Sequence, residues 1–165
     1  MGNQDFRNCK AIVFDWGDTL MVDFPGKPGP MKDWDEVQAV DGAHEVLRTL
    51  SENYLIYLAT GADTTPDNIE TAMKRVGLSS FISRYFCHQV LGEHKSSVKF
   101  YHAIIRELDL APAEIVMIGD SLDKDILPAK KAGMRGIWLA QGSMESAECK
   151  VTSIRTLEEL VSILN

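Results

Sequence analysis

AIVFDWGDTL, residues 11–20, is the stretch that decides the fold of this chain. Its four leading apolar residues run directly into a carboxylate, Asp15. An unbroken apolar run of this kind is typical of a parallel strand that is buried on both faces. A second run with the same ending, IVMIGD at residues 115–120, closes on Asp120. Open α/β sheets bind ligands beyond the carboxyl ends of their strands, so we expect both carboxylates to face one crevice. Like charges at close range are costly, and the pair must therefore share a cation or a proton.

Strands and helices alternate along the rest of the chain. Apolar runs predict further strands at 54–59, within 81–87, at 136–139 and, as a short edge strand, at 151–154. Helical spacing predicts helices that begin after Asp41, which we expect to be an N-cap, and at 66–76, 98–108, 124–132 and 157–164. This alternation predicts an α/β protein with a three-layer, doubly wound, Rossmann-type parallel sheet, forming a single domain over residues 1–165.

Residues 21–40 interrupt the alternation. The segment PGKPGP at 25–30 fixes φ at the prolines and permits turns at the glycines. A loop of this length in a compact domain is usually functional or mobile, so we predict a small lid here. The gap of roughly two dozen residues is too short for an independently packed cap domain, and no sizeable cap is expected.

Composition limits the classes of partner. The chain has 165 residues and a net charge of −7, which argues against nucleic acid or an anionic membrane as the main partner. A phosphorylated substrate is compatible with this negative charge, because a metal ion can supply local positive charge. The three cysteines (Cys9, Cys87 and Cys149) are far apart and form no CxxC pair, which favours a reducing compartment. No signal-peptide pattern and no apolar run near the roughly 20 residues of a membrane helix is present, so we expect a cytoplasmic protein.

Four polar motifs follow strands or precede a helix. They are FDWGDTL at 14–20, LATG at 58–61, Lys95 ahead of FY at 100–101, and GDSLDKD at 119–125 running on to AKKAGM at 129–134. Their order and settings resemble the haloacid dehalogenase superfamily, most of whose members are phosphatases. Each motif alone is a weak signal, but all four occur in order and span most of the chain. The resemblance implies a magnesium-dependent phosphohydrolase with an aspartyl-phosphate intermediate and a phosphorylated small molecule or macromolecule as its substrate.

The roles that this resemblance implies agree with the chemistry of the residues. Asp15 would be the nucleophile, because a carboxylate can form an acyl phosphate. Lys95 would stabilise both the nucleophile and the transferring group. Thr60, with the backbone N–H groups of Gly61 and Ala62, would bind phosphate oxygens. In isolation, Thr60 is more often a helix cap and Lys95 a solvated surface lysine.

The resemblance also implies a magnesium site. Its ligands would be Asp15, Asp120 and the backbone carbonyl of Gly17, since Mg²⁺ prefers oxygen ligands. Asp125, or alternatively Asp123, would orient a water molecule or Lys95.

One position departs from the family pattern. Most phosphatases of the family carry a second Asp two residues after the nucleophile, which protonates the leaving group and then activates water. Here that position is Gly17, and Asp18 comes one residue later. Loss of a general acid–base typically costs about 10²–10⁴ in rate. Three outcomes are open. Asp18 could reach into the active site as the catalytic acid, or the enzyme could act only on substrates with good leaving groups. Alternatively, the chain could be a catalytically weak phosphate-binding or regulatory protein.

The third motif has two candidate lysines. Lys99 competes with Lys95 for this role, and we prefer Lys95 because it precedes the helix. The crevice itself, with no cap above it, would suit a large substrate, or a homo-oligomer in which a neighbouring subunit closes the site. A receiver-like phospho-acceptor domain ranks lower, because a receiver has its acidic pair near the start and its phospho-acceptor on a central strand.

Overall fold

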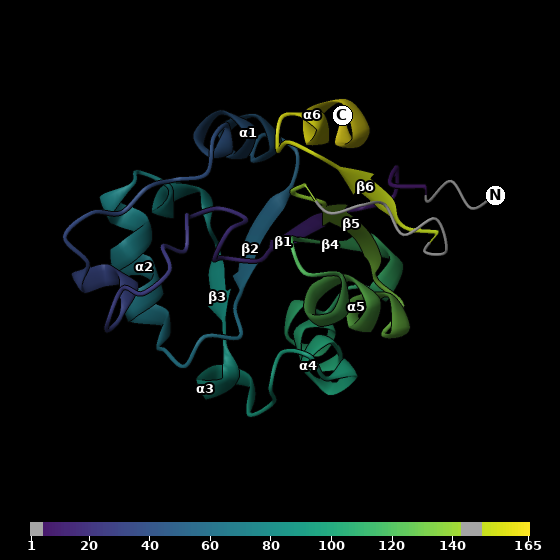
Figure 1. The fold of residues 1–165 in the computed structure, drawn as a ribbon. Helices are drawn as coiled ribbons and strands as arrows, with labels where there is room; N and C mark the ends of the chain where they lie inside the picture. Colours follow the sequence, from purple (N-terminus) through teal and green to yellow (C-terminus); the bar gives the residue numbers. More distant parts are fainter. Residues whose placement is uncertain (1–4, 143–149) are drawn as a thin grey trace.

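A six-stranded, wholly parallel sheet forms the centre of the molecule (Figure 1). The computed structural model describes residues 5–142 and 150–165. The strand order is β3-β2-β1-β4-β5-β6. The strands are β1 Ala11–Phe14, β2 Leu55–Ala59, β3 Arg84–Phe86, β4 Ile115–Gly119, β5 Arg135–Leu139 and β6 Thr152–Ile154.

Helices connect the strands and cover both faces of the sheet. They are α1 Ala43–Leu50, α2 Pro66–Arg75, α3 His88–Leu91, α4 Val98–Leu108, α5 Leu127–Lys131 and α6 Glu159–Leu164. Short 3₁₀ turns lie at Met31–Asp33, Ser79–Phe81 and Pro112–Glu114, and a π-helical turn at Leu122–Ile126 precedes α5.

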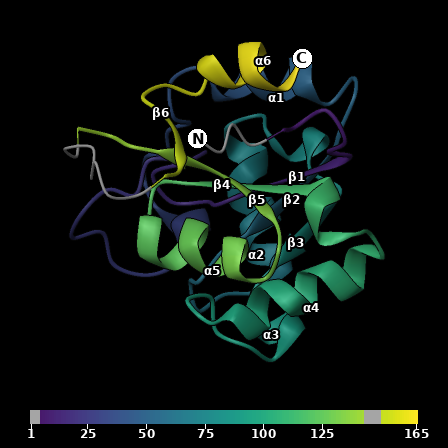
Figure 2. The ribbon, with the colours of Figure 1, turned by 90° about the vertical axis from the view of Figure 1, so that its right-hand side faces the viewer.

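Strand β1 contributes to two hydrophobic cores because its side chains alternate between the two faces. Ile12 and Phe14 pack in the core that contains residues of α1, α2 and α6. Ala11 and Val13 pack in the core that contains residues of α4 and α5. Figure 2 shows this layering, with α1 and α6 above the strands and α4 and α5 below them. All four side chains are fully buried, as expected for the unbroken apolar run.

The strand order creates one topological switch point. The chain passes from β1 outward to β3, returns to β4 on the other side of β1, and continues outward to β6. Ligand crevices in such sheets form where the order reverses, at the carboxyl ends of the two central strands. Here these are the ends of β1 and β4, directly before Asp15 and Asp120.

The predicted fold class is confirmed, and the differences are local. The N-cap of α1 is Gly42, with a left-handed φ of 80°, so the prediction that Asp41 caps this helix is wrong. The predicted helix over 124–132 is divided into the π-helical turn and α5, and α3 was not predicted. In the part of the chain that the structure describes, none of the helices combines the length and apolar character needed to cross a bilayer. Cys149 lies outside the described residues, while Cys9 and Cys87 are buried free thiols.

Candidate active site

The two central strands bring Asp15 and Asp120 to the same edge of the sheet. Phe14 pairs with Ile118 in the β1–β4 register, and the N–H of Asp15 donates to the carbonyl of Ile118 at 2.9 Å. The hydroxyl of Thr19 lies 3.0 Å from Oδ2 of Asp15 and 3.4 Å from Oδ1 of Asp120. Asp15 and Asp120 therefore lie close together at one edge of the sheet, as the two apolar runs predict.

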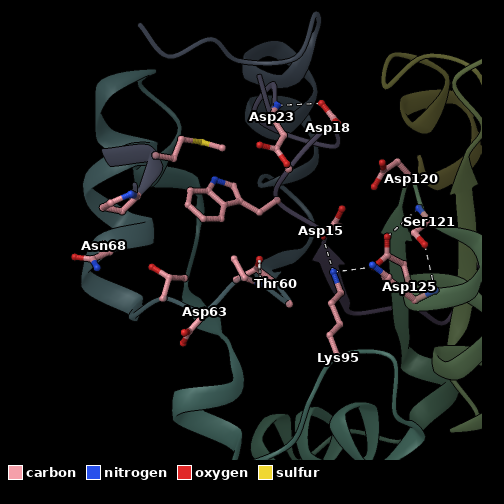
Figure 3. Close-up of a pocket in the computed structure, with 18 of the residues that line it drawn as sticks. Asp15, Asp18, Asp23, Thr60, Asp63, Asn68, Lys95, Asp120, Ser121 and Asp125 are labelled. Carbon is pink, nitrogen blue, oxygen red and sulfur yellow. Dashed lines mark hydrogen bonds and ion pairs between the residues drawn. The ribbon is translucent and has the colours of Figure 1, made fainter. Parts of the chain in front are cut away.

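Lys95 is buried between the carboxylates (Figure 3). Its Nζ lies 2.5 Å from Oδ1 of Asp15, 2.7 Å from Oδ1 of Asp125 and 2.9 Å from the carbonyl oxygen of Ala59. An ammonium group has three protons to donate, and these three acceptors match them. Lys99, the alternative candidate, is exposed on α4. The structure thus places Lys95 in the cluster and Lys99 outside it.

Charge pairing sets the protonation of this cluster. Burial alone would raise the pKa of Asp15, but the positive charge of Lys95 and hydrogen bonds outweigh it, and the pKa lies below its ordinary value. Burial likewise opposes the charge on Lys95, yet Asp15 and Asp125 hold the pKa of Lys95 above its ordinary value. The nucleophile candidate is therefore an ionised carboxylate paired with a cation.

The turn after β4 fixes Asp125. One of its carboxylate oxygens pairs with Lys95, and the other, Oδ2, accepts the N–H of Ser121 at 3.1 Å. Gly119 makes this approach feasible, because a Cβ there would collide with the carboxylate of Asp125. Asp123 is exposed on the same turn. Of the two candidates for an orienting role, Asp125 is the one in contact with Lys95.

Asp120 lies beside the negative charges of Asp15 and Asp125, which oppose its ionisation. Burial, a hydrogen bond with Asp15, and the charges of Asp15 and Asp125 raise the pKa of Asp120 to about 7. The indole N–H of Trp138 donates to the backbone carbonyl of Asp120 at 3.0 Å and holds the main chain in place. A cation between Asp15 and Asp120 would relieve this repulsion.

The donor atoms fit a divalent cation. Ligand atoms of Asp15, Asp120 and Asp125 all lie within 4.8 Å of one another. Asp125 is held by the ammonium group of Lys95 and by the backbone N–H of Ser121. Oδ2 of Asp15 and Oδ1 of Asp120 instead share the hydroxyl of Thr19, whose proton can rotate away and leave both oxygens to Mg²⁺, which prefers hard oxygen ligands.

The loop after β2 forms a second wall of the pocket. Thr60 is buried, and its hydroxyl oxygen accepts the N–H of Ala62 at 3.0 Å. Gly61 and Ala62 are exposed and line the same pocket as Asp15 and Lys95. The three predicted phosphate-binding residues thus line the pocket that contains the candidate nucleophile, although the Ala62 N–H already donates to Thr60.

The segment after Asp15 folds back on itself. Asp18 has a left-handed φ of 58°, and its N–H donates to the carbonyl of Met21 at 2.6 Å. The carboxylate of Asp18 accepts the N–H of Asp23 at 3.0 Å. Burial, followed by the charges of Asp18 and Asp15, raises the pKa of Asp23. Both side chains line the pocket, and Asp23 was not singled out by the sequence.

Part of the loop 21–40 forms one side of a cavity of about 1100 Å³. Met31, Lys32 and Trp34 come from this loop, and Asp63 and Asn68 come from the segment that leads into α2. None of these five residues belongs to the four sequence motifs, so only the path of the chain shows that they line the site. The loop lies beside α2 in Figure 1, and Arg75 of that helix donates to three of its carbonyls.

Comparisons with known proteins agree with this arrangement. A family model described as haloacid dehalogenase-like hydrolase matches residues 27–133. Glyceraldehyde 3-phosphate phosphatase from Methanocaldococcus jannaschii is 31% identical over 123 residues, which cover 72% of this chain and 54% of that protein. Pyrimidine 5'-nucleotidase PynA from Streptococcus pneumoniae is 31% identical over 112 residues, or 66% of this chain and 46% of that protein. The chain thus spans about half the length of these relatives.

A solved structure shows the same fold. The putative hydrolase YfnB from Bacillus subtilis, determined with bound magnesium, aligns with a TM-score of 0.77 and 17% identity. The alignment covers 95% of this chain and 99% of that chain. With the family match over residues 27–133 and the arrangement at the ends of β1 and β4, the chain belongs to the haloacid dehalogenase-like hydrolases.

Proposed function

We propose that this protein is a magnesium-dependent phosphohydrolase that forms an aspartyl phosphate on Asp15. The observation that carries the proposal is the ionised Asp15, paired with Lys95 and adjacent to Asp120 in an open pocket. Bound Mg²⁺ would supply charge neutralisation for the phosphoryl group. The phosphatase and nucleotidase names of relatives near 30% identity support the same class of reaction.

Each residue of the site has its own role in the proposed reaction. Asp15 attacks phosphorus while the bond from phosphorus to the leaving oxygen breaks, and water then cleaves the acyl phosphate to release inorganic phosphate. Lys95 offsets the charge that gathers on the transferring group. Thr60 and the N–H of Gly61 bind phosphoryl oxygens. Asp125 acts through Lys95, which it holds in position.

The substrate class follows from the relatives and the cavity. Several relatives are named for small phosphorylated molecules, including glyceraldehyde 3-phosphate and ribulose 1,5-bisphosphate. We propose a small phosphate monoester as the substrate, and the cavity of about 1100 Å³ has room for one. The buried free thiols of Cys9 and Cys87 suit the proposed cytosolic location. That this protein forms a homo-oligomer stays a prediction.

The test of the nucleophile is Asp15→Asn, assayed for phosphate release from p-nitrophenyl phosphate and for hydroxylamine-sensitive phosphoenzyme. We expect turnover to fall at least about 10³-fold and the phosphoenzyme to vanish, because an amide cannot form the acyl phosphate. Asp33→Asn is the control, since Asp33 is exposed and pairs with Lys32. Wild-type turnover by Asp15→Asn in folded protein would refute the proposal, as would the absence of any turnover by the wild type with Mg²⁺.

The same assay tests the metal. Chelation should abolish turnover, and added Mg²⁺ should restore it. Asp120→Asn should lose most of the Mg²⁺-induced rise in melting temperature, because one of the two ligand carboxylates is gone. Asp123→Asn, on the exposed side of the same turn, is the matched control. Equal Mg²⁺ stabilisation of wild type and Asp120→Asn would place the metal elsewhere.

A further inference from the structure

Gly17 has no side chain beside the nucleophile, and the side chain of another residue, Asp23, lies next to it. A Cβ built on Gly17 would lie 3.4 Å from Cβ, 3.5 Å from Oδ2 and 3.7 Å from Cγ of Asp23. These are ordinary van der Waals distances, so the side chain of Asp23 lies in contact with the place where a side chain at position 17 would begin. A carboxylate from six residues further along the chain is therefore next to the position of the missing Asp.

The turn between β1 and the loop delivers Asp23 to this place. The N–H groups of Leu20 and Met21 donate to the carbonyl of Trp16 at 2.9 and 3.1 Å, and the chain reverses direction there. The N–H of Asp23 then donates to Oδ1 of Asp18 at 3.0 Å. The carboxylate of Asp18 is therefore engaged in holding the loop, and the side chain of Asp23 is held over Gly17.

Asp23 faces the reacting groups. It lines the same cavity as Asp15, Thr60 and Lys95. In Figure 3 its carboxylate hangs from the loop toward Asp15, while the carboxylate of Asp18 is turned toward the backbone of Asp23. Lys95 contacts Asp15 from the opposite side of the pocket from Asp23 in this view. An in-line leaving group departs on the side of phosphorus away from Asp15, into the cavity that Asp23 lines.

We propose that Asp23 is the general acid and base of the phosphatase reaction, an inference that rests on the function proposed above. As Asp15 forms its bond to phosphorus and the leaving oxygen departs, the carboxyl group of Asp23 gives its proton to that oxygen. The resulting carboxylate then takes a proton from a water molecule whose oxygen bonds to phosphorus. The Asp15–phosphorus bond breaks, inorganic phosphate leaves, and both side chains return to their starting states.

The first test compares two leaving groups. Asp23→Asn keeps the backbone N–H that holds the loop and removes only the proton transfer. With glycerol phosphate, whose alkoxide leaves poorly, we expect turnover to fall about 10²–10³-fold. With p-nitrophenyl phosphate, whose phenolate needs no proton, the first step should stay nearly as fast as in the wild type. Hydrolysis of the phosphoenzyme should be slowed, so a burst of about one p-nitrophenol per enzyme should precede a slow steady state.

The second test moves the carboxylate. Asp23→Ala alone should resemble Asp23→Asn, and adding Gly17→Asp should restore at least tenfold of the lost turnover, because the vacated volume accepts the new side chain. Glu36→Gln is the control; Glu36 is exposed in the same loop, and its loss should change turnover less than twofold. Melting temperatures show whether each variant folds.

The outcomes separate this inference from the proposed function. If Asp15→Asn is inactive but Asp23→Asn slows both substrates equally and gives no burst, Asp23 is not the acid and base. A burst and a selective loss on glycerol phosphate in Asp18→Asn, with none in Asp23→Asn, would assign the role to Asp18 instead. Activity that survives Asp15→Asn would overturn the function proposed above, and with it this inference.

Discussion

Lys95 is the residue on which the charge balance of the pocket depends. Removing one partner of a buried ion pair leaves the other charge uncompensated, which costs more than the pair itself contributes. Lys95 has two such partners, Asp15 and Asp125, whose side chains are 12% and 2% exposed. Its replacement therefore leaves two buried carboxylates without a cation.

We expect Lys95→Met to lower the free energy of unfolding by about 3–5 kcal/mol. Urea titration followed by circular dichroism, at pH 7.5 and with a metal chelator present, measures this change in the free energy of unfolding. Adding Asp125→Asn should recover part of the lost stability, since it removes one of the two uncompensated carboxylate charges. Lys99→Met, exposed on α4, should cost less than about 0.5 kcal/mol. Similar losses in Lys95→Met and Lys99→Met would show that the buried pairing contributes little.

At the scale of elements, helix α2 fixes the shape of the loop 21–40. The guanidinium of Arg75 donates to the carbonyls of Lys32, Trp34 and Asp35 at 3.1, 2.6 and 3.3 Å. The base of the loop is closed by a bridge between Met21 and Ala39. The predicted lid is therefore held at its base and along the side that faces α2.

We expect Arg75→Ala to destabilise the protein by about 1–2 kcal/mol, because three charge-assisted contacts are lost. Trypsin should then cleave after Lys32 several-fold faster, as followed by mass spectrometry under native conditions. Lys74→Ala is the matched control, since Lys74 forms an exposed ion pair with Glu70 on the same helix. Unchanged cleavage in Arg75→Ala would mean that the contacts of Arg75 do not order the loop.

The sequence predicted the elements better than it predicted the path of the chain between them. Buried strands were recognisable because burial on both faces requires continuous apolar runs, such as residues 11–14 and 115–118. Lys95 could be preferred over Lys99 because a residue ahead of a helix can reach the sheet edge. Asp23 could not be predicted, since its approach to Gly17 depends on the turn at 16–21. Likewise, the π-helical turn that directs Asp125 inward depends on tertiary packing rather than on local propensity.

At the scale of the whole molecule, four segments far apart in the sequence meet in one cavity. They follow β1, β2, α3 and β4, and all lie at the carboxyl edge of the sheet. A ligand at the switch point touches all four segments at once, so binding should restrain them together.

We expect Mg²⁺ with orthovanadate to slow amide hydrogen exchange in peptides that cover residues 15–23, 60–64, 94–96 and 120–125. These segments contribute residues to the lining of the cavity. Peptides from β6 and α6, on the far edge of the sheet, serve as internal references and should exchange unchanged. Protection centred on β6 would place the ligand away from the switch point.

The saturation of Lys95 also has a consequence for chemical labelling. An amine reacts with anhydrides and activated esters only through a free lone pair, and the three contacts of Lys95 keep its nitrogen protonated and shielded. Solvent-facing amines such as Lys10 and Lys74 will be acylated first. Modification of Lys95 then requires its contacts with Asp15, Asp125 and Ala59 to break, so its acylation rate reports how often this cluster opens.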